Sequence, residues 1–223
     1  MSHPHQLHAT RAAHALADAR YRLDTAVTRE RAERRAEARI TAAASAIQAW
    51  RPNPGPTGKG GHGDPASRAA VNHLEPEWRD GHLARLAASI DGTLHWLAAS
   101  TTRRGYDDPL AHLQALARRI GPTGAHHLWR WLDEADQRIR EQLHLDPDGQ
   151  PLPGIRCPRC ARRQLVAHTT GPRRTWTVTC VPECVCAGAG CPCGMTQPAA
   201  SAPHVWGDGH PLLDHVLTSS NAA

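Results

Sequence analysis

The sequence predicts a mainly α-helical protein, with a helical N-terminal arm and a helical bundle, that ends in a small C-terminal β-hairpin module of the zinc-ribbon type. Two observations predict this fold class. The first 156 residues lack cysteine and carry apolar residues at helical spacing, whereas all seven cysteines lie between Cys157 and Cys193. The length of 223 residues, 40% of them hydrophobic, suits one ordinary domain and a small module.

Residues 1–50 are predicted to form one long helical arm. No Gly or Pro occurs between Thr10 and Trp50, and the strong helix formers Ala and Arg dominate. The apolar stripe is thin, and the middle of the segment, TRERAERRAEAR, is almost wholly charged. This pattern is typical of a solvated arm or a loose coiled-coil partner rather than of a core element.

Residues 51–64, RPNPGPTGKGGHGD, are predicted to be a flexible linker because they hold three Pro and five Gly. The GKG within this segment lacks the spacing of a phosphate-binding loop, and no strand precedes it, which disfavours a nucleotide site. Asp64 and Pro65 are suited to the cap and the first turn of a new helix.

A helical domain is predicted over residues 65–150. Leucine and isoleucine recur at helical spacing in three stripes, which run from Leu83 to Leu97, from Leu110 to Ile120 and from Leu128 to Leu143. Residues 121–124 separate the last two helices, and so short a connection favours an antiparallel pair. The pair also fits a DNA-binding helix-turn-helix, but residues 51–150 carry 12 basic and 13 acidic residues, which suits phosphate binding poorly.

Residues 151–223 are predicted to form the zinc-ribbon module, followed by a short C-terminal helix. A Cys157-Pro-Arg-Cys160 knuckle precedes two β-prone runs, Gln164–His168 and Thr175–Thr179, and Cys180 closes the second run. A CxxC turn places two sulfurs on one side of a metal, and tetrahedral zinc requires two more ligands on the other side. The spacing therefore predicts at least one zinc ion.

Seven cysteines are one fewer than the eight ligands that two closed tetrahedral centres require, so we expect a histidine to complete the set. The first predicted centre takes Cys157, Cys160, Cys180 and one of Cys184 or Cys186. The second takes the other of that pair with Cys191, Cys193 and His204. Two zinc ions are thus the preferred count, and iron is the alternative metal, because four thiolates also hold iron.

Other uses of the cysteines are disfavoured. A secreted disulfide framework normally has an even number of cysteines and an apolar signal segment, and neither is found here. A catalytic zinc needs an open coordination position and a nearby general base, but surplus sulfurs can close this site and Glu183 is the one acid among the cysteines. We therefore expect a structural metal in a cytoplasmic protein that is not an enzyme, with no small-molecule substrate and no membrane partner.

The cysteine-rich segment resembles a group of uncharacterised proteins from actinobacteria and their phages, which pair an Ala/Arg-rich helical region with a terminal zinc-ribbon-like module. The resemblance covers residues 156–206 and is only architectural before them. It implies a cytoplasmic bacterial or phage-encoded zinc protein, with no established activity to transfer. The residues that carry it are Arg156-Cys-Pro-Arg-Cys160, Trp176-Thr-Val-Thr-Cys180, Cys184-Val-Cys186, Cys191-Pro-Cys193 and His204-Val-Trp206.

We expect the module to bind nucleic acid or to tether a nucleic-acid machine. All six of its arginines precede Cys180, and with Trp176 they are candidates to hold phosphates and stack a base. They are Arg156, Arg159, Arg162, Arg163, Arg173 and Arg174. Because deprotonated ligands offset the charge of bound zinc, the loaded module is close to neutral, and a merely solvated basic rim is the alternative. The alternative function is a protein–protein adaptor, encoded by a phage or mobile element, in which the helix 10–50 pairs with a partner and the zinc module is another docking surface.

Overall fold

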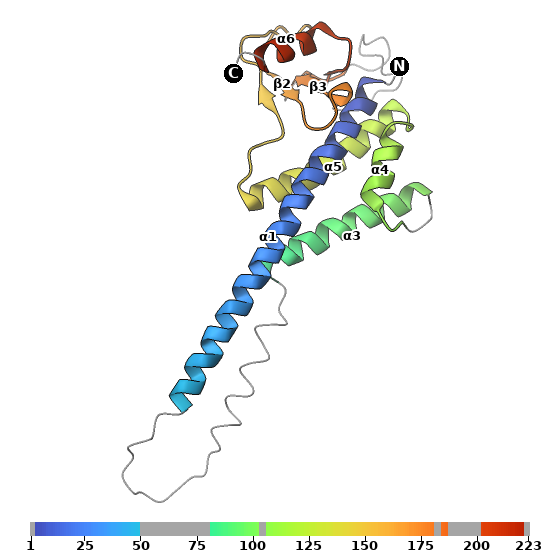
Figure 1. Ribbon diagram of the computed structural model, residues 1–223. Helices are drawn as coiled ribbons and strands as arrows, with labels where there is room; N and C mark the ends of the chain where they lie inside the picture. The colour runs from blue at the N-terminus through green and yellow to red at the C-terminus, as the bar shows by residue number, and fades with distance from the viewer. Residues whose placement is uncertain (1–2, 50–80, 103–105, 181–183, 187–201, 221–223) are drawn as a thin grey trace, which may run out of the picture. The chain divides into compact units, whose positions relative to one another are not determined.

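A computed structural model describes residues 3–49, 81–102, 106–180, 184–186 and 202–220 (Figure 1). It is mostly helical, with a small antiparallel four-stranded sheet in the C-terminal region, which confirms the predicted fold class. The predicted linker 51–64 and the helix start at Asp64-Pro65 lie outside the described residues. The chain forms two compact units, residues 1–21 with 90–223, and residues 22–89. None of the described helices has the length and hydropathy needed to cross a bilayer.

Four helices supply most of the chain's helical structure: α1 (Pro4–Ala49), α3 (His82–Thr102), α4 (Pro109–Ala117) and α5 (Pro122–Leu143). The buried side chains of α3, α4 and α5 in the first unit follow the predicted apolar stripes. They include Ile90, Leu94 and Leu97 of α3, Leu110 and Leu113 of α4, and Leu128, Leu132, Ala135 and Ile139 of α5. The Asp108 carboxylate accepts a hydrogen bond from the Ala111 N–H, at 2.9 Å, and Pro109 occupies the first turn of α4.

The start of α1 is part of the core of the first unit. Residues 5–19 bury most of their side chains, among them Ala9, Ala12 and Leu16. The sequence predicts a solvated arm here, because alanine stripes look weakly apolar. Small side chains nevertheless let a helix approach its neighbours closely, so a stripe of alanines buries well. Most residues of the charged stretch 29–39 are exposed, as expected for a solvated surface.

The second unit, residues 22–89, contains the rest of α1 and the first turns of α3. Among its described residues, the buried apolar side chains are Leu23 and Val27 of α1 and Ala84 of α3. The Glu30 carboxylate accepts a hydrogen bond from the His82 N–H, at 3.0 Å, and thereby caps the start of α3. A Cβ at Gly81 would overlap this carboxylate, so glycine leaves the space that the cap requires.

The sheet lies wholly in the first unit, and its four strands are adjacent in sequence order. They are β1 (Gln150–Pro151), β2 (Leu165–His168), β3 (Thr177–Cys180) and β4 (Val205–Trp206). The predicted second run, Thr175–Thr179, begins two residues late, because a short 3₁₀ helix, η1 (Arg173–Thr175), completes the turn after Pro172. The strands β1 and β4, two residues each, are too short for an alternating pattern to predict.

A small apolar core holds the sheet to α6 (Pro211–Ser220), which Figure 1 shows above β2 and β3. It joins the inward side chains of the two central strands to those of α6 and to three cysteines. Its buried members are Cys157, Leu165, Ala167, Val178, Cys180, Cys184, Leu212, Leu213 and Val216. So few large apolar side chains contribute little stabilisation.

Candidate metal centre

Four cysteines meet at one end of the sheet. Cys157 and Cys160 come from the knuckle before β2, Cys180 is the last residue of β3, and Cys184 follows the chain segment after it. Their four sulfur atoms all lie within 4.8 Å of one another. The structure therefore brings together the three cysteines that the sequence assigns to the first centre and resolves the choice of the fourth in favour of Cys184.

The sulfur–sulfur distances fit a tetrahedral metal. Cys157 Sγ lies 3.7 Å from Cys184 Sγ, and Cys160 Sγ lies 3.7 Å from Cys180 Sγ. A tetrahedron with metal–sulfur bonds of about 2.3 Å has sulfur–sulfur edges of about 3.8 Å. A disulfide would bring two sulfurs to about 2.05 Å, and all four cysteines are free thiols. This geometry could hold one metal ion on four thiolates.

The knuckle is shaped by its own backbone hydrogen bonds. The Ala161 N–H donates to the Cys157 carbonyl at 2.9 Å, and the Cys157 N–H donates to the Arg162 carbonyl at 2.8 Å. Ala161 adopts a positive φ of 59°, which turns the chain tightly behind the second cysteine. The Arg159 N–H also points at Cys157 Sγ, at 3.4 Å, where it stabilises negative charge on the sulfur.

The thiols differ in how readily they lose a proton. The Arg162 backbone N–H lowers the pKa of Cys160 to about 7. Burial, and then the neighbouring thiols, raise the pKa of Cys180 and raise that of Cys184 to about 12. Four adjacent thiolates repel one another and need a cation among them, so metal binding must displace protons and strengthen as pH rises.

The remaining predicted ligands stand apart from this group. Cys186 is buried, but its sulfur does not belong to the four-sulfur group. Cys191 and Cys193 lie outside the described residues, as does any second centre that they complete. The buried His204 faces Cys184 across a short antiparallel bridge, with its Nδ1 atom 3.1 Å from Cys184 Sγ and 3.0 Å from the Cys184 carbonyl oxygen. In this position the imidazole borders the first centre.

The predicted nucleic-acid surface is exposed. The six arginines of the knuckle and the hairpin turn, Arg156, Arg159, Arg162, Arg163, Arg173 and Arg174, are all exposed. Trp176 is only half-buried, but it packs against the small core of the module. Its indole N–H donates to the Gly171 carbonyl at 3.0 Å, so this tryptophan also fixes the hairpin turn. The arginines are thus better placed than Trp176 to meet a partner.

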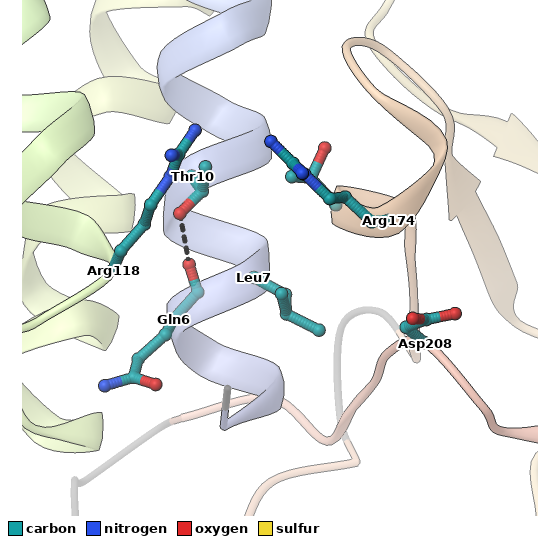
Figure 2. A pocket seen from close by; sticks show the side chains of 7 residues that line it. Gln6, Leu7, Thr10, Arg118, Arg174 and Asp208 are labelled. Carbon is teal, nitrogen blue, oxygen red and sulfur yellow. Dashed lines mark hydrogen bonds between the residues drawn. The ribbon is translucent and has the colours of Figure 1, made fainter. Parts of the chain in front are cut away.

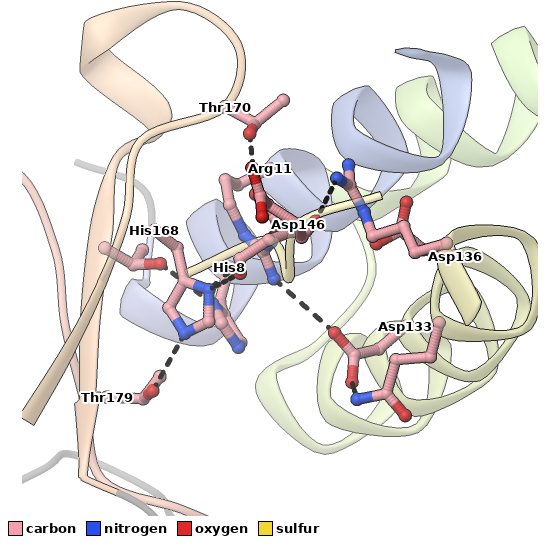
Figure 3. A network of polar contacts seen from close by, with 12 residues as sticks. His8, Arg11, Asp133, Asp136, Asp146, His168, Thr170 and Thr179 are labelled. Carbon is pink, nitrogen blue, oxygen red and sulfur yellow. Dashed lines mark hydrogen bonds and ion pairs between the residues drawn. The ribbon is translucent and has the colours of Figure 1, made fainter. Parts of the chain in front are cut away.

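A buried polar network joins the start of α1 to α5 and the sheet, and sequence analysis does not predict it (Figure 3). The Arg11 side chain has 0% exposure, forms an ion pair with Asp148 and lies 3.9 Å from Asp133 of α5. The Asp148 carboxylate also accepts a hydrogen bond from the Thr170 hydroxyl at 2.6 Å. The one signal in the sequence is a lone arginine within an alanine stripe.

Two histidines of this network lie against β3. His8 Nδ1 is 2.8 Å from the Thr177 hydroxyl, which ties α1 to the strand. His168 Nδ1 is 2.8 Å from the Asp148 carbonyl, to which it must donate, so the His168 Nε2 atom accepts from the Thr179 hydroxyl at 3.0 Å. This pairing fixes one neutral form of His168, and burial, with repulsion from Arg11, lowers the pKa of its ring to about 3.

Acid is therefore expected to destabilise the first unit. In the unfolded chain His168 binds a proton near its ordinary pKa of 6.5, but in the folded chain it does so only near pH 3. Between these values the unfolded state holds more protons, and at pH 5 this ring alone lowers the free energy of unfolding by about 2 kcal/mol relative to pH 7. Urea unfolding at pH 7 and pH 5 measures the loss, which a His168→Gln variant should reduce by about that amount. Equal losses in both proteins would contradict the assignment.

In comparisons with known proteins, no family model, no curated protein and no solved structure matches the chain.

Proposed function

We propose that this chain is a non-enzymatic zinc protein whose metal-held hairpin binds nucleic acid. Zinc is favoured over iron because a CxxC knuckle followed by a hairpin and returning cysteines is a common plan of structural zinc sites. Four mutually adjacent sulfurs would complete the coordination of one ion, which leaves no position for a substrate. The metal would then supply folding free energy to a module with a small apolar core.

The observation that carries the proposal is the exposure of all six arginines on the knuckle and turn that this metal would hold in place. Guanidinium groups bind phosphate oxygens in a forked geometry and keep their charge at any physiological pH. Residues 151–223 contain these six arginines and three acidic residues. The basic side chains are therefore concentrated on one rigid feature, even though the module as a whole is close to neutral.

Replacing Arg162, Arg163, Arg173 and Arg174 by alanine is expected to abolish nucleic-acid binding without releasing zinc. If these four side chains each neutralise one phosphate, the affinity of the natural chain falls about a hundredfold between 50 and 200 mM salt. Fluorescence anisotropy with labelled 20-nucleotide RNA, single-stranded DNA and duplex DNA measures this dependence, and elemental analysis measures the zinc.

A second variant, with Arg29, Arg31, Arg35 and Arg39 replaced by alanine, is the matched control. These arginines are also exposed and lie on α1, far along the chain from the hairpin. Their substitution removes the same number of positive charges, four. The control should keep most of its affinity if the hairpin forms the binding surface. Equal losses in the two variants would mean that net charge, rather than the hairpin, attracts the nucleic acid.

A protein–protein adaptor is the second candidate. Trp96 of α3 and Trp131 of α5 are exposed by 58% and 43% and form an edge-to-face pair with ring centroids 5.7 Å apart. Exposed tryptophans are enriched where proteins bind one another. Residues 10–19 are part of the core, so a partner of the predicted 10–50 surface would contact the later residues. Such binding should respond little to salt, which separates the two candidates.

A further inference from the structure

A second basic surface lies beside the hairpin, in a cleft of about 400 Å³ in the first unit (Figure 2). The start of α1 forms its floor, with Arg118 at the end of α4 on one side and Arg174 of η1 on the other. Figure 2 shows both arginine side chains directed toward the Thr10 turn of α1. The remaining lining residues are Gln6, Leu7, Thr175 and Asp208.

His14 lies one turn beyond Thr10, and the charges of both guanidinium groups affect its ring. Burial lowers the pKa of its ring, and Arg118 and Arg174 lower it further. Its Nε2 atom is buried and has no hydrogen-bond partner among the described residues. The hairpin turn is seated on this histidine, because a Cβ at Gly171 would lie 2.9 Å from the His14 side chain. The two arginines that line the cleft, from two different elements, thus both lie near this turn of α1.

The hydrogen-bond donors that remain available in the cleft favour an anionic ligand. The Thr10 hydroxyl already donates to the Gln6 carbonyl at 2.8 Å, and the Gln6 amide donates to the Ile120 carbonyl at 2.8 Å. The guanidinium groups therefore supply most of the donors still available to a ligand. Within the described residues, neither Arg118 nor Arg174 lies within 4 Å of a carboxylate oxygen, although Asp208 lines the same cleft.

We propose that Arg118 and Arg174 together hold one phosphate group of the bound nucleic acid, so that its path continues from the hairpin onto the end of α4. This inference rests on the proposed function and adds to it a residue of the helical part. Two arginines that approach one phosphate from opposite sides can each donate two hydrogen bonds to its oxygens. Arg118 lies outside the cysteine-rich segment, so the sequence offers no reason to select it as a nucleic-acid-binding residue.

The test compares Arg118→Gln with Arg119→Gln in the zinc-loaded full chain. Arg119 is the adjacent exposed arginine, but its guanidinium donates to the Ala115 carbonyl and does not line the cleft. With a labelled 20-nucleotide oligonucleotide, Arg118→Gln should weaken binding about tenfold and reduce the slope of log affinity against log salt by about 1. Arg119→Gln should stay within about twofold of the natural chain.

A double-mutant cycle tests whether the two arginines share a phosphate. If they do, the variant Arg118→Gln/Arg174→Gln should bind appreciably better than the product of the two single effects predicts, because either substitution already disrupts the shared contact. Losses that simply multiply would place the two arginines on separate phosphates and overturn the shared site. Zinc content and thermal unfolding should be unchanged throughout, since both side chains are exposed.

A separate arm uses inorganic phosphate and NMR of the His14 ring. Bound phosphate offsets the two guanidinium charges and should raise the pKa of His14 in the natural chain but not in Arg118→Gln. If Arg118→Gln binds oligonucleotide like Arg119→Gln while the four-arginine hairpin variant does not bind, the proposed function stands and this inference fails. If only inorganic phosphate acts, the anion site stands but its ligand is a free phosphate and not nucleic acid. If neither ligand binds, both proposals fail.

Discussion

Replacing both Cys157 and Cys160 by serine is expected to remove one metal ion per chain and to unfold the sheet. Structural zinc contributes about 10–16 kcal/mol to the folding of small modules, as much as the whole stability of a typical domain. The apolar core around these cysteines is too small to replace that contribution. Elemental analysis measures the metal, and hydrogen exchange followed by mass spectrometry measures the protection of residues 165–180.

The loss should spread to the start of α1, because His8 and Arg11 would lose their partners on the sheet side, Thr177 and Asp148. Cys186→Ser is the matched control: it lies two residues from Cys184 but outside the four-sulfur group, so the first centre should keep its ion. Retained exchange protection over residues 165–180 in a metal-free double variant would contradict the assignment of a structural metal.

Arg11→Met is expected to lower the free energy of unfolding by about 3–5 kcal/mol. The substitution leaves the Asp148 carboxylate, whose side chain is only 7% exposed, without its cation. Methionine replaces the aliphatic part of the arginine side chain, so most of the loss should come from the charge rather than from packing. Urea unfolding, monitored by circular dichroism, gives the change directly.

Arg20→Met on the same helix is the control. Arg20 pairs with Asp91 at 2.6 Å, but the side chains are 23% and 43% exposed, so this pair should contribute at most about 1 kcal/mol. Adding Asp148→Asn to Arg11→Met should restore part of the stability, because it removes the uncompensated charge. Similar losses for Arg11→Met and Arg20→Met would show that the buried ion pair contributes no more to the free energy of unfolding than the exposed one.

The parts of the fold that depend on neighbouring residues are predictable from the sequence. Leu128, Leu132 and Ile139 are buried because their spacing places them on one face of α5, and Asp108 caps α4 because a short polar side chain precedes a proline. The CxxC of the knuckle likewise brings two sulfurs together through local backbone geometry. These features are determined by residues that are close to one another in the sequence.

The rest depends on contacts between distant segments. Nothing near Arg11 in the sequence shows that Asp148 will neutralise it, and an unpaired arginine in a helix is normally solvated. The grouping of Cys184, rather than Cys186, with the knuckle cysteines depends on a contact between residues far apart in the chain. That Arg118 and Arg174 line the same cleft cannot be predicted without knowing how α4, α1 and η1 pack together.

The contact between His8 and Thr177 joins residues 169 positions apart and has a consequence for biosynthesis. At about 5–20 residues per second, a ribosome would add the partner strand roughly 10–30 s after α1 has been made. Helices form within about a microsecond, so α1 would wait over this interval, with Arg11 and His8 still hydrated, until its partners on the sheet have been made. Metal binding at the four cysteines and completion of this unit are therefore expected to follow the synthesis of α1 by at least this interval.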